Sequence, residues 1–85
     1  MGHNRDISYI KAFGRHLKKL RLAKNLSQED LSLECVIPQS QIGRFERGER
    51  GPTIDTVRIL AEGLGEEPKV LLDFKYKSKR KNKPL

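Results

Sequence analysis

The chain has 85 residues and a mass of 9.8 kDa, which leaves room for one domain and excludes a two-domain enzyme. Apolar residues make up 35% of it and aromatic residues 6%, so any core consists mainly of leucine, isoleucine and valine, and a roomy substrate cavity is not expected. The net charge of +7 points to a polyanionic partner.

A first helix is predicted over residues 8–23, after an N-terminal arm of residues 1–7. Apolar residues recur there at steps of three and four, which places them on one face of a helix whose other side is basic. These residues are Ile10, Phe13, Leu17 and Leu20. His16 lies on the same segment, and we expect it at the surface.

The second and third helices are predicted to be short and to be joined by a tight turn. Ser27 can cap the second helix, and Asp30 stands three residues on, where it completes a capping box. Pro38 disfavours helical geometry in the residue before it, so the second helix ends near Cys35. The third helix spans residues 39–47, because proline is tolerated at a helix start. We expect Cys35 to pack in the core.

The last two helices are predicted over residues 54–64 and 68–74. Thr53 caps the first of them and Gly65 ends it, while Pro68 opens the second. The apolar face of the longer helix consists of Ile54, Val57, Leu60, Ala61 and Leu64. Five helices and no strand result, so the predicted fold class is all-α.

Two short helices joined by a turn of three or four residues follow the helix-turn-helix plan. The polar face of the third helix differs from the Glu/Lys mixture of an ordinary solvated helix, and it carries Gln39, Ser40, Gln41 and Arg44. Glutamine can pair bidentately with adenine and arginine with guanine in the major groove. This pattern favours a helix that reads DNA, with a merely solvent-exposed face as the alternative.

Three spaced motifs resemble the Cro/repressor-type (XRE-like) family of bacterial and phage helix-turn-helix regulators. They are LSQEDL at 26–31, IGRFERG at 42–48, and PTI at 52–54 followed by LA at 60–61 and LG at 64–65. The resemblance covers roughly residues 10–74. It implies a lambda repressor-like five-helix bundle over residues 8–74, with a central helix-turn-helix that places the third helix in the major groove of operator DNA. The resemblance implies a transcriptional regulator, such as a repressor, and leaves open whether it activates or represses.

The resemblance also implies roles for single residues. The base contacts are Gln39, Ser40 and Arg44, and the phosphate contacts are Ser27, Gln28, Gln41, Arg47 and Arg50. Arg21 and Glu46 correspond to a charge pair that braces the third helix. Val36 stands where the family usually has glycine, and Pro38 replaces a Ser or Thr cap, so we expect a remodelled turn. Gly63 replaces a common alanine and is expected to weaken its helix by ~1 kcal/mol.

A homodimer is expected, because one short recognition helix reads only a few base pairs. Val70 and Phe74 exceed what the family that the sequence resembles normally needs for core closure and are the predicted dimer contacts, with simple closure of the core as the alternative. Residues 51–74 carry a net charge of −3, which keeps this half away from phosphates, whereas residues 1–50 carry +4. Residues 75–85 hold six basic side chains and no acidic one. This basic tail is either a disordered, solubilising segment or a DNA contact.

Other classes of function receive little support. Cys35 is the single cysteine, and with His3 and His16 it forms no set at metal-ligand spacing. No nucleophile has a partnered base, and no apolar stretch approaches the ~18 residues of a membrane span. We expect a cytoplasmic protein that binds double-stranded DNA, with no enzyme activity, cofactor, metal, membrane contact or small-molecule ligand.

The subclass stays open between a phage-type repressor, a restriction-modification controller and the antitoxin of a toxin–antitoxin pair. A second hypothesis is a protein-interaction module, such as an antitoxin or a polymerase-contacting factor. Such a module would attach to nucleic acid only unspecifically, through the basic tail.

Overall fold

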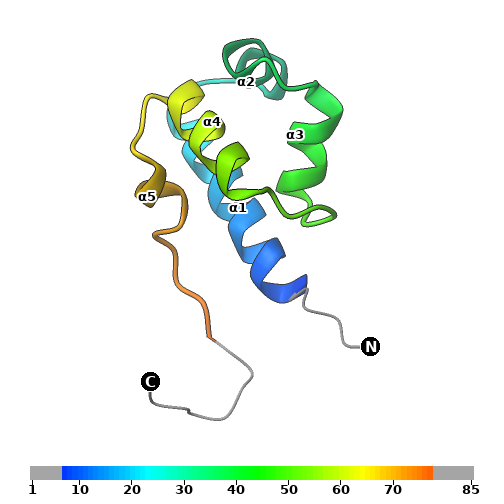
Figure 1. The fold of residues 1–85 in the computed structure, drawn as a ribbon, viewed down its shortest axis with the longest axis vertical. Coiled ribbons are helices and arrows are strands. Elements are labelled where there is room, and N and C mark those ends of the chain that lie inside the picture. The colour runs from blue at the N-terminus through cyan, green and yellow to red at the C-terminus, as the bar shows by residue number, and fades with distance from the viewer. Residues whose placement is uncertain (1–6, 78–85) are drawn as a thin grey trace.

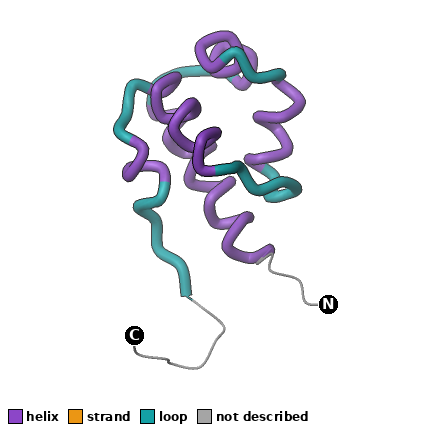
Figure 2. The backbone as a smooth tube through the Cα atoms, viewed as in Figure 1, coloured by secondary structure: helices purple, strands orange, loops and turns teal. Residues whose placement is uncertain are grey.

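The computed structural model describes residues 7–77, and all regular structure in that range is helical (Figures 1 and 2). The helices are α1 (Ile7–Ala23), α2 (Gln28–Cys35), α3 (Gln39–Glu46), α4 (Ile54–Leu64) and α5 (Pro68–Leu71). The predicted all-α fold with five helices is confirmed. The first helix begins one residue earlier than expected, and the last ends at Leu71 rather than residue 74. The N-terminal arm up to residue 6 and the tail from residue 78 lie outside the described residues.

The long helix α1 organises the arrangement. Helices α3 and α5 both pack against it, α2 contacts α3 and α4, and α4 contacts α5. In Figure 1, α3 and α5 lie on opposite sides of α1 and α4. The helix predicted to read DNA is therefore separated from α5 by α1 and α4.

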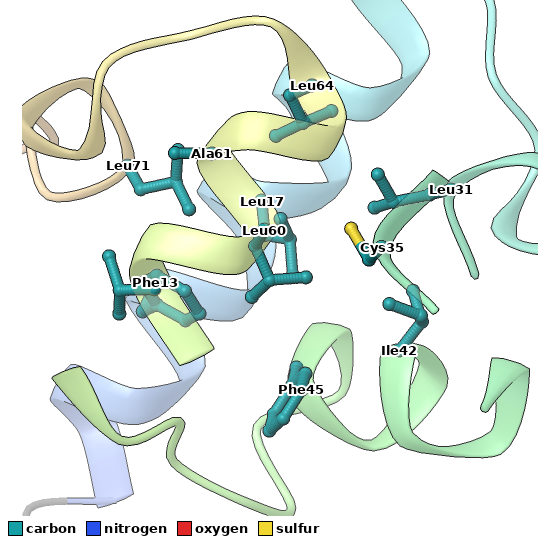
Figure 3. Close-up of a cluster of buried hydrophobic side chains, with 11 residues drawn as sticks. Phe13, Leu17, Leu31, Cys35, Ile42, Phe45, Leu60, Ala61, Leu64 and Leu71 are labelled. Carbon is teal, nitrogen blue, oxygen red and sulfur yellow. The ribbon is translucent and has the colours of Figure 1, made fainter. Parts of the chain in front are cut away.

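The core lies between these helices, which each contribute apolar side chains to one cluster (Figure 3). Its largest fully buried members are Leu17, Leu31, Ile42, Leu60 and Leu71. Cys35 is buried among them, as expected, and its thiol donates a hydrogen bond to the carbonyl oxygen of Ile59 at 3.6 Å. Burial, as the larger cause, and the nearby charge of Glu34 raise the pKa of this thiol, which disfavours the reactive thiolate.

A glycine allows α1 and α3 to approach closely. A Cβ atom on Gly14 would overlap the backbone carbonyl oxygens of Phe45 and Glu46 at the end of α3. Any larger residue would push the two helices apart, because the atoms that it would meet belong to the backbone rather than to flexible side chains. Gly14 therefore sets the distance between the longest helix and the helix that carries the candidate reading face.

The turn between α2 and α3 is not remodelled, contrary to expectation. Val36 adopts the left-handed conformation, with φ 56° and ψ 43°, and its N–H donates to the carbonyl oxygen of Ser32. The N–H of Ile37 donates to the same oxygen at 3.2 Å, which completes a standard helix end. A left-handed non-glycine residue costs roughly 1–2 kcal/mol, because its Cβ lies close to the following carbonyl oxygen, and Val36 adopts this conformation with its side chain 89% exposed.

Two further expectations were wrong. Ile54 does not belong to the buried face of α4, since it is 82% exposed, while Val57, Leu60, Ala61 and Leu64 are buried. It occupies the first position of α4, at the edge of the domain. His16 is not a plain surface residue: it is partly buried, and its Nε2 lies 2.8 Å from the carbonyl oxygen of Val70, a hydrogen bond that joins α1 to α5.

Candidate nucleic-acid interface

Helix α3 turns a polar face to solvent. Its predicted base-reading residues Gln39, Ser40 and Arg44 are all exposed, and Gln41 is partly buried beside them. Arg44 forms no ion pair within residues 7–77. The structure thus brings the three candidate reading residues together on one accessible surface.

A shallow hollow of about 520 Å³ lies between this face and the start of α2. Its lining consists of a glycine and of side chains that end in an amide, a hydroxyl or a guanidinium group. The residues are Gln28, Gln39, Ser40, Gly43, Arg44 and Arg47. No carboxylate side chain lines it. Donor groups with positive charge and no competing acid suit a phosphate oxygen or a base edge.

A buried ion pair holds α3 against α1. Arg21 donates from Nε to Glu46 Oε2 at 2.6 Å and from Nη2 to Glu46 Oε1 at 3.0 Å. Its Nη1 donates to the carbonyl oxygen of Leu26 at 2.8 Å. The exposed fractions of the two charged side chains are only 7% and 3%. Such a pair fixes geometry rather than adding much net stability, because desolvation offsets the attraction between the charges.

Gln28 extends this ion pair to α2. Its Nε2 donates to Glu46 Oε1 at 3.0 Å, so the carboxylate of Glu46 accepts from side chains of both α1 and α2. Gln28 was predicted as a phosphate contact only. The structure places it in the lining of the hollow, where it also helps to orient α3.

The N-terminus of α2 is capped reciprocally. Ser27 Oγ accepts from the N–H of Asp30 at 2.9 Å, and Asp30 Oδ2 accepts from the N–H of Ser27 at 2.9 Å. The backbone hydrogen bond from Ser27, followed by the one from its hydroxyl, lowers the pKa of Asp30. The hydroxyl of Ser27 is thus engaged within the helix start. A phosphate there would meet the first N–H groups of the helix, which have no intrahelical acceptor.

The two arginines after α3 differ in their surroundings. Arg47 is paired with Glu49, whose carboxylate accepts from Nε at 2.8 Å and from Nη2 at 3.2 Å. Arg50 is exposed and lines a different groove, beside Pro52. The sequence did not predict the pairing of Glu49 with Arg47. The spacing of two residues near a loop does not determine their geometry, because this geometry depends on the path of the loop.

A second groove, of about 760 Å³, is largely apolar and lies between α1, the loop before α4 and the end of α5. Ile54, which is 82% exposed, and Leu72, which is 44% exposed, line it together with Tyr9 and Pro52. The sequence did not predict these residues as surface contacts, and it assigned Ile54 to the apolar face of its helix. Solvent exposure is the property that distinguishes them.

The predicted dimer contacts Val70 and Phe74 do not line this groove themselves. Val70 is partly buried, and Phe74 packs against the rings of Tyr9 and His16, with centroids 5.2 and 5.5 Å away. Tyr76 continues the cluster, with its ring 4.8 Å from that of Tyr9. The packed chain therefore extends two residues beyond the predicted end of the domain.

Residues 7–77 offer neither a membrane span nor a metal site. No helix in that range is long and apolar enough to cross a membrane. No three histidine, cysteine, aspartate or glutamate side chains in the same range gather closely enough to hold a metal ion.

Comparison with known proteins agrees with this geometry. A family model described as helix-turn-helix matches residues 17–71. The control protein C.BamHI of Bacillus amyloliquefaciens is 41% identical over 63 residues, which cover 73% of this chain and 78% of that protein.

Solved structures give the same result. The restriction-modification controller protein C.AhdI of Aeromonas hydrophila superposes with a TM-score of 0.74 at 38% identity, covering 75% of this chain and 97% of that one. The controller C.Esp1396I, solved as a tetramer with its natural 35 base-pair operator, has a TM-score of 0.71 at 28% identity and covers 76% and 86% of the two chains. These relatives are named as regulators and not as enzymes. The chain belongs to the Cro/repressor-type helix-turn-helix family.

Proposed function

We propose that this protein is a sequence-specific, DNA-binding transcriptional regulator that reads its operator with α3 in the major groove. The observation that carries the proposal is the exposed face of Gln39, Ser40 and Arg44 on a helix that a buried ion pair holds in place. Base contacts specify a sequence only if the helix that carries them has a defined orientation. Phosphate contacts from Ser27, Gln28, Gln41, Arg47 and Arg50 would set that orientation on the duplex. Such a regulator acts in the cytoplasm of a bacterial cell.

Within this class we propose a restriction-modification controller rather than a phage repressor or an antitoxin. The support is that the relatives C.BamHI and C.AhdI are both named as control proteins at 41% and 38% identity. Genes for a DNA methyltransferase and an endonuclease beside the gene for this chain would agree with the proposal. A neighbouring toxin gene would contradict it.

We propose a homodimer whose contact surface is the apolar groove. A second copy is the favoured occupant because Ile54 and Leu72 leave a contiguous apolar surface in water, and a two-fold pair would double a short reading surface. Phe74 would support this surface through its contact with the ring of Tyr9, whereas Val70 does not line the groove. Glu49 and Arg50 also line this groove, so pairing there would cover part of the loop after α3. Gln39, Ser40 and Arg44 lie outside it, so both reading faces would stay free.

Selection from a pool of random duplexes tests the proposed function. We expect an enriched sequence with two-fold symmetry, whose half-sites are about one turn of DNA apart, bound at least ~10³-fold more tightly than a scrambled duplex. A protein-interaction module with unspecific attachment predicts no enriched sequence. That outcome would reject the DNA-reading proposal.

A further inference from the structure

Arg47 and Glu49 form an exposed ion pair at the edge of the candidate interface. The carboxylate of Glu49 accepts two hydrogen bonds from one edge of the guanidinium, at 2.8 and 3.2 Å. The side chains are 58% and 53% exposed. An ion pair in this setting is made in water and adds little to stability, so its partners can be exchanged.

The remaining nitrogen of Arg47 faces the hollow beside α3. Its Nη1 lies 2.9 Å from the point that a Cβ on residue 43 would occupy, and Gln28 Oε1 lies 3.6 Å from the same point. Arg47 thus presents Nη1 to the hollow, while Glu49 holds the edge formed by Nε and Nη2. A phosphate that enters the hollow meets a guanidinium whose charge is already balanced.

We propose that Glu49 competes with DNA phosphates for Arg47 and so lowers the affinity of the α3 surface for the DNA backbone, whatever the base sequence. This inference rests on the proposed function, because it assumes that DNA lies against α3. Hydrogen bonding to Arg47 lowers the pKa of the Glu49 carboxyl, so the competitor is charged at neutral pH.

The competition has a physical consequence in a chain with a net charge of +7. Each phosphate that a protein neutralises strengthens its binding to DNA of any sequence. Base contacts then contribute a smaller part of the total binding free energy. A carboxylate next to one phosphate-binding arginine reduces unspecific capture without touching a base-reading residue. Glu49 therefore limits the backbone contribution and leaves the ratio of specific to unspecific affinity unchanged.

The variant Glu49→Gln tests this inference, because it keeps the side-chain shape and removes the charge. Glu67→Gln is the matched control: Glu67 also pairs with a basic residue two positions away, Lys69 at 3.6 Å, but it lies at the start of α5, away from α3. Dissociation constants are measured by fluorescence anisotropy on the selected duplex and on a scrambled one, at several salt concentrations. Circular dichroism checks that each variant is folded, and sedimentation velocity checks that its self-association is unchanged, because Glu49 also lines the apolar groove.

We expect Glu49→Gln to bind both duplexes roughly three- to tenfold more tightly at low salt, with an increase that shrinks as salt rises. The slope of log affinity against log salt should steepen by up to ~0.9 if one additional phosphate is neutralised. Glu67→Gln should stay within about twofold of the parent on both duplexes. Unchanged or weaker binding of Glu49→Gln would overturn the inference, since Glu49 would then only support the loop.

A second comparison tests whether Glu49 acts through Arg47. In an Arg47→Ala background, Glu49→Gln should raise affinity at most about twofold, because the contested guanidinium is gone. If Glu49→Gln raises affinity in the Arg47→Ala background as much as in the parent, Glu49 repels phosphate directly. That result would reject competition for Arg47. If selection finds no preferred duplex, the proposed function fails. The effect of Glu49→Gln can still be measured on the scrambled duplex, so the two failures are distinguishable.

Discussion

The sulfur of Cys35 occupies the space that a side chain at residue 63 would need. A Cβ atom on Gly63 would overlap Cys35 Sγ and would lie 3.4 Å from Leu31 Cδ1. Gly63 stands where the resemblance implies a common alanine. Cys35 on α2 therefore faces Gly63 on α4, and the missing side chain of Gly63 leaves the volume that the sulfur of Cys35 fills.

Gly63→Ala alone should destabilise the protein by ~1–2 kcal/mol, because overpacking against the sulfur exceeds the ~1 kcal/mol that alanine adds in helix propensity. Cys35→Ala alone should also destabilise, because it leaves a small cavity. The double variant should recover most of both losses, with a coupling of roughly 0.5–3 kcal/mol. Urea unfolding of the four proteins measures this cycle. Additive effects would show that the two residues do not compensate.

The capping box of α2 should make stability depend on pH. The folded-state pKa of Asp30 lies below its unfolded value, so the charged carboxylate stabilises the fold above about pH 4. This contribution is lost as pH falls through the folded pKa. Thermal unfolding of the parent and Asp30→Asn should therefore differ at pH 7 and converge toward about pH 2. If the difference in thermal stability between the two proteins stays constant over this pH range, the charge of Asp30 does not have the stabilising role assigned to it.

The apolar groove should be the dimer surface. Ile54→Glu should weaken self-association at least ~10-fold, because it places a charge in the buried contact, while the fold is kept since this side chain is 82% exposed. Leu33→Glu is the matched control, as Leu33 is 71% exposed on α2, outside the groove. Sedimentation velocity over a range of concentrations compares the variants. Equal association of all proteins would place the interface elsewhere.

Arg44 should carry sequence preference rather than general affinity. Arg44→Ala is expected to lose about 1–3 kcal/mol on the selected duplex and to relax preference at one base pair in each half-site. Binding to a scrambled duplex should change little. Arg58→Ala on α4, where Arg58 pairs with Asp55 and Glu62, is the control and should affect neither duplex. Equal weakening on both duplexes would make Arg44 a phosphate contact.

Removal of residues 78–85 should change the general affinity for DNA rather than the sequence preference, which is the opposite of the effect expected for Arg44→Ala. This segment lies outside the described residues and contains Lys79, Arg80, Lys81 and Lys83. We expect lower affinity on every duplex and a salt dependence that flattens by roughly 0.9 for each phosphate that the tail had neutralised. Cutting after residue 77 keeps Tyr76, whose ring packs on Tyr9. If neither affinity nor salt dependence moves, the tail only solubilises the protein.

Local signals in the sequence determined the number of helices, their starts and the identity of the helix proposed to read DNA. Caps such as Ser27 and Thr53 and apolar repeats act within one or two turns, so they can be recognised before the packing of the helices is known. The pairing of Arg21 with Glu46 also followed from the family motif and is present in the structure. The turn at Val36 was misjudged, because the chain keeps the left-handed conformation there and accepts its local cost.

Tertiary structure alone decided which apolar residues face water and which charges meet. Ile54 and Leu60 both fit the apolar spacing of one helix, yet one is 82% exposed and the other fully buried, because only one of them has a neighbouring helix over it. The compensation between Cys35 and Gly63 joins α2 to α4. The contact of Glu49 with Arg47 depends on the path of a loop. Periodicity describes one helix at a time, whereas exposure and pairing depend on where the other elements lie.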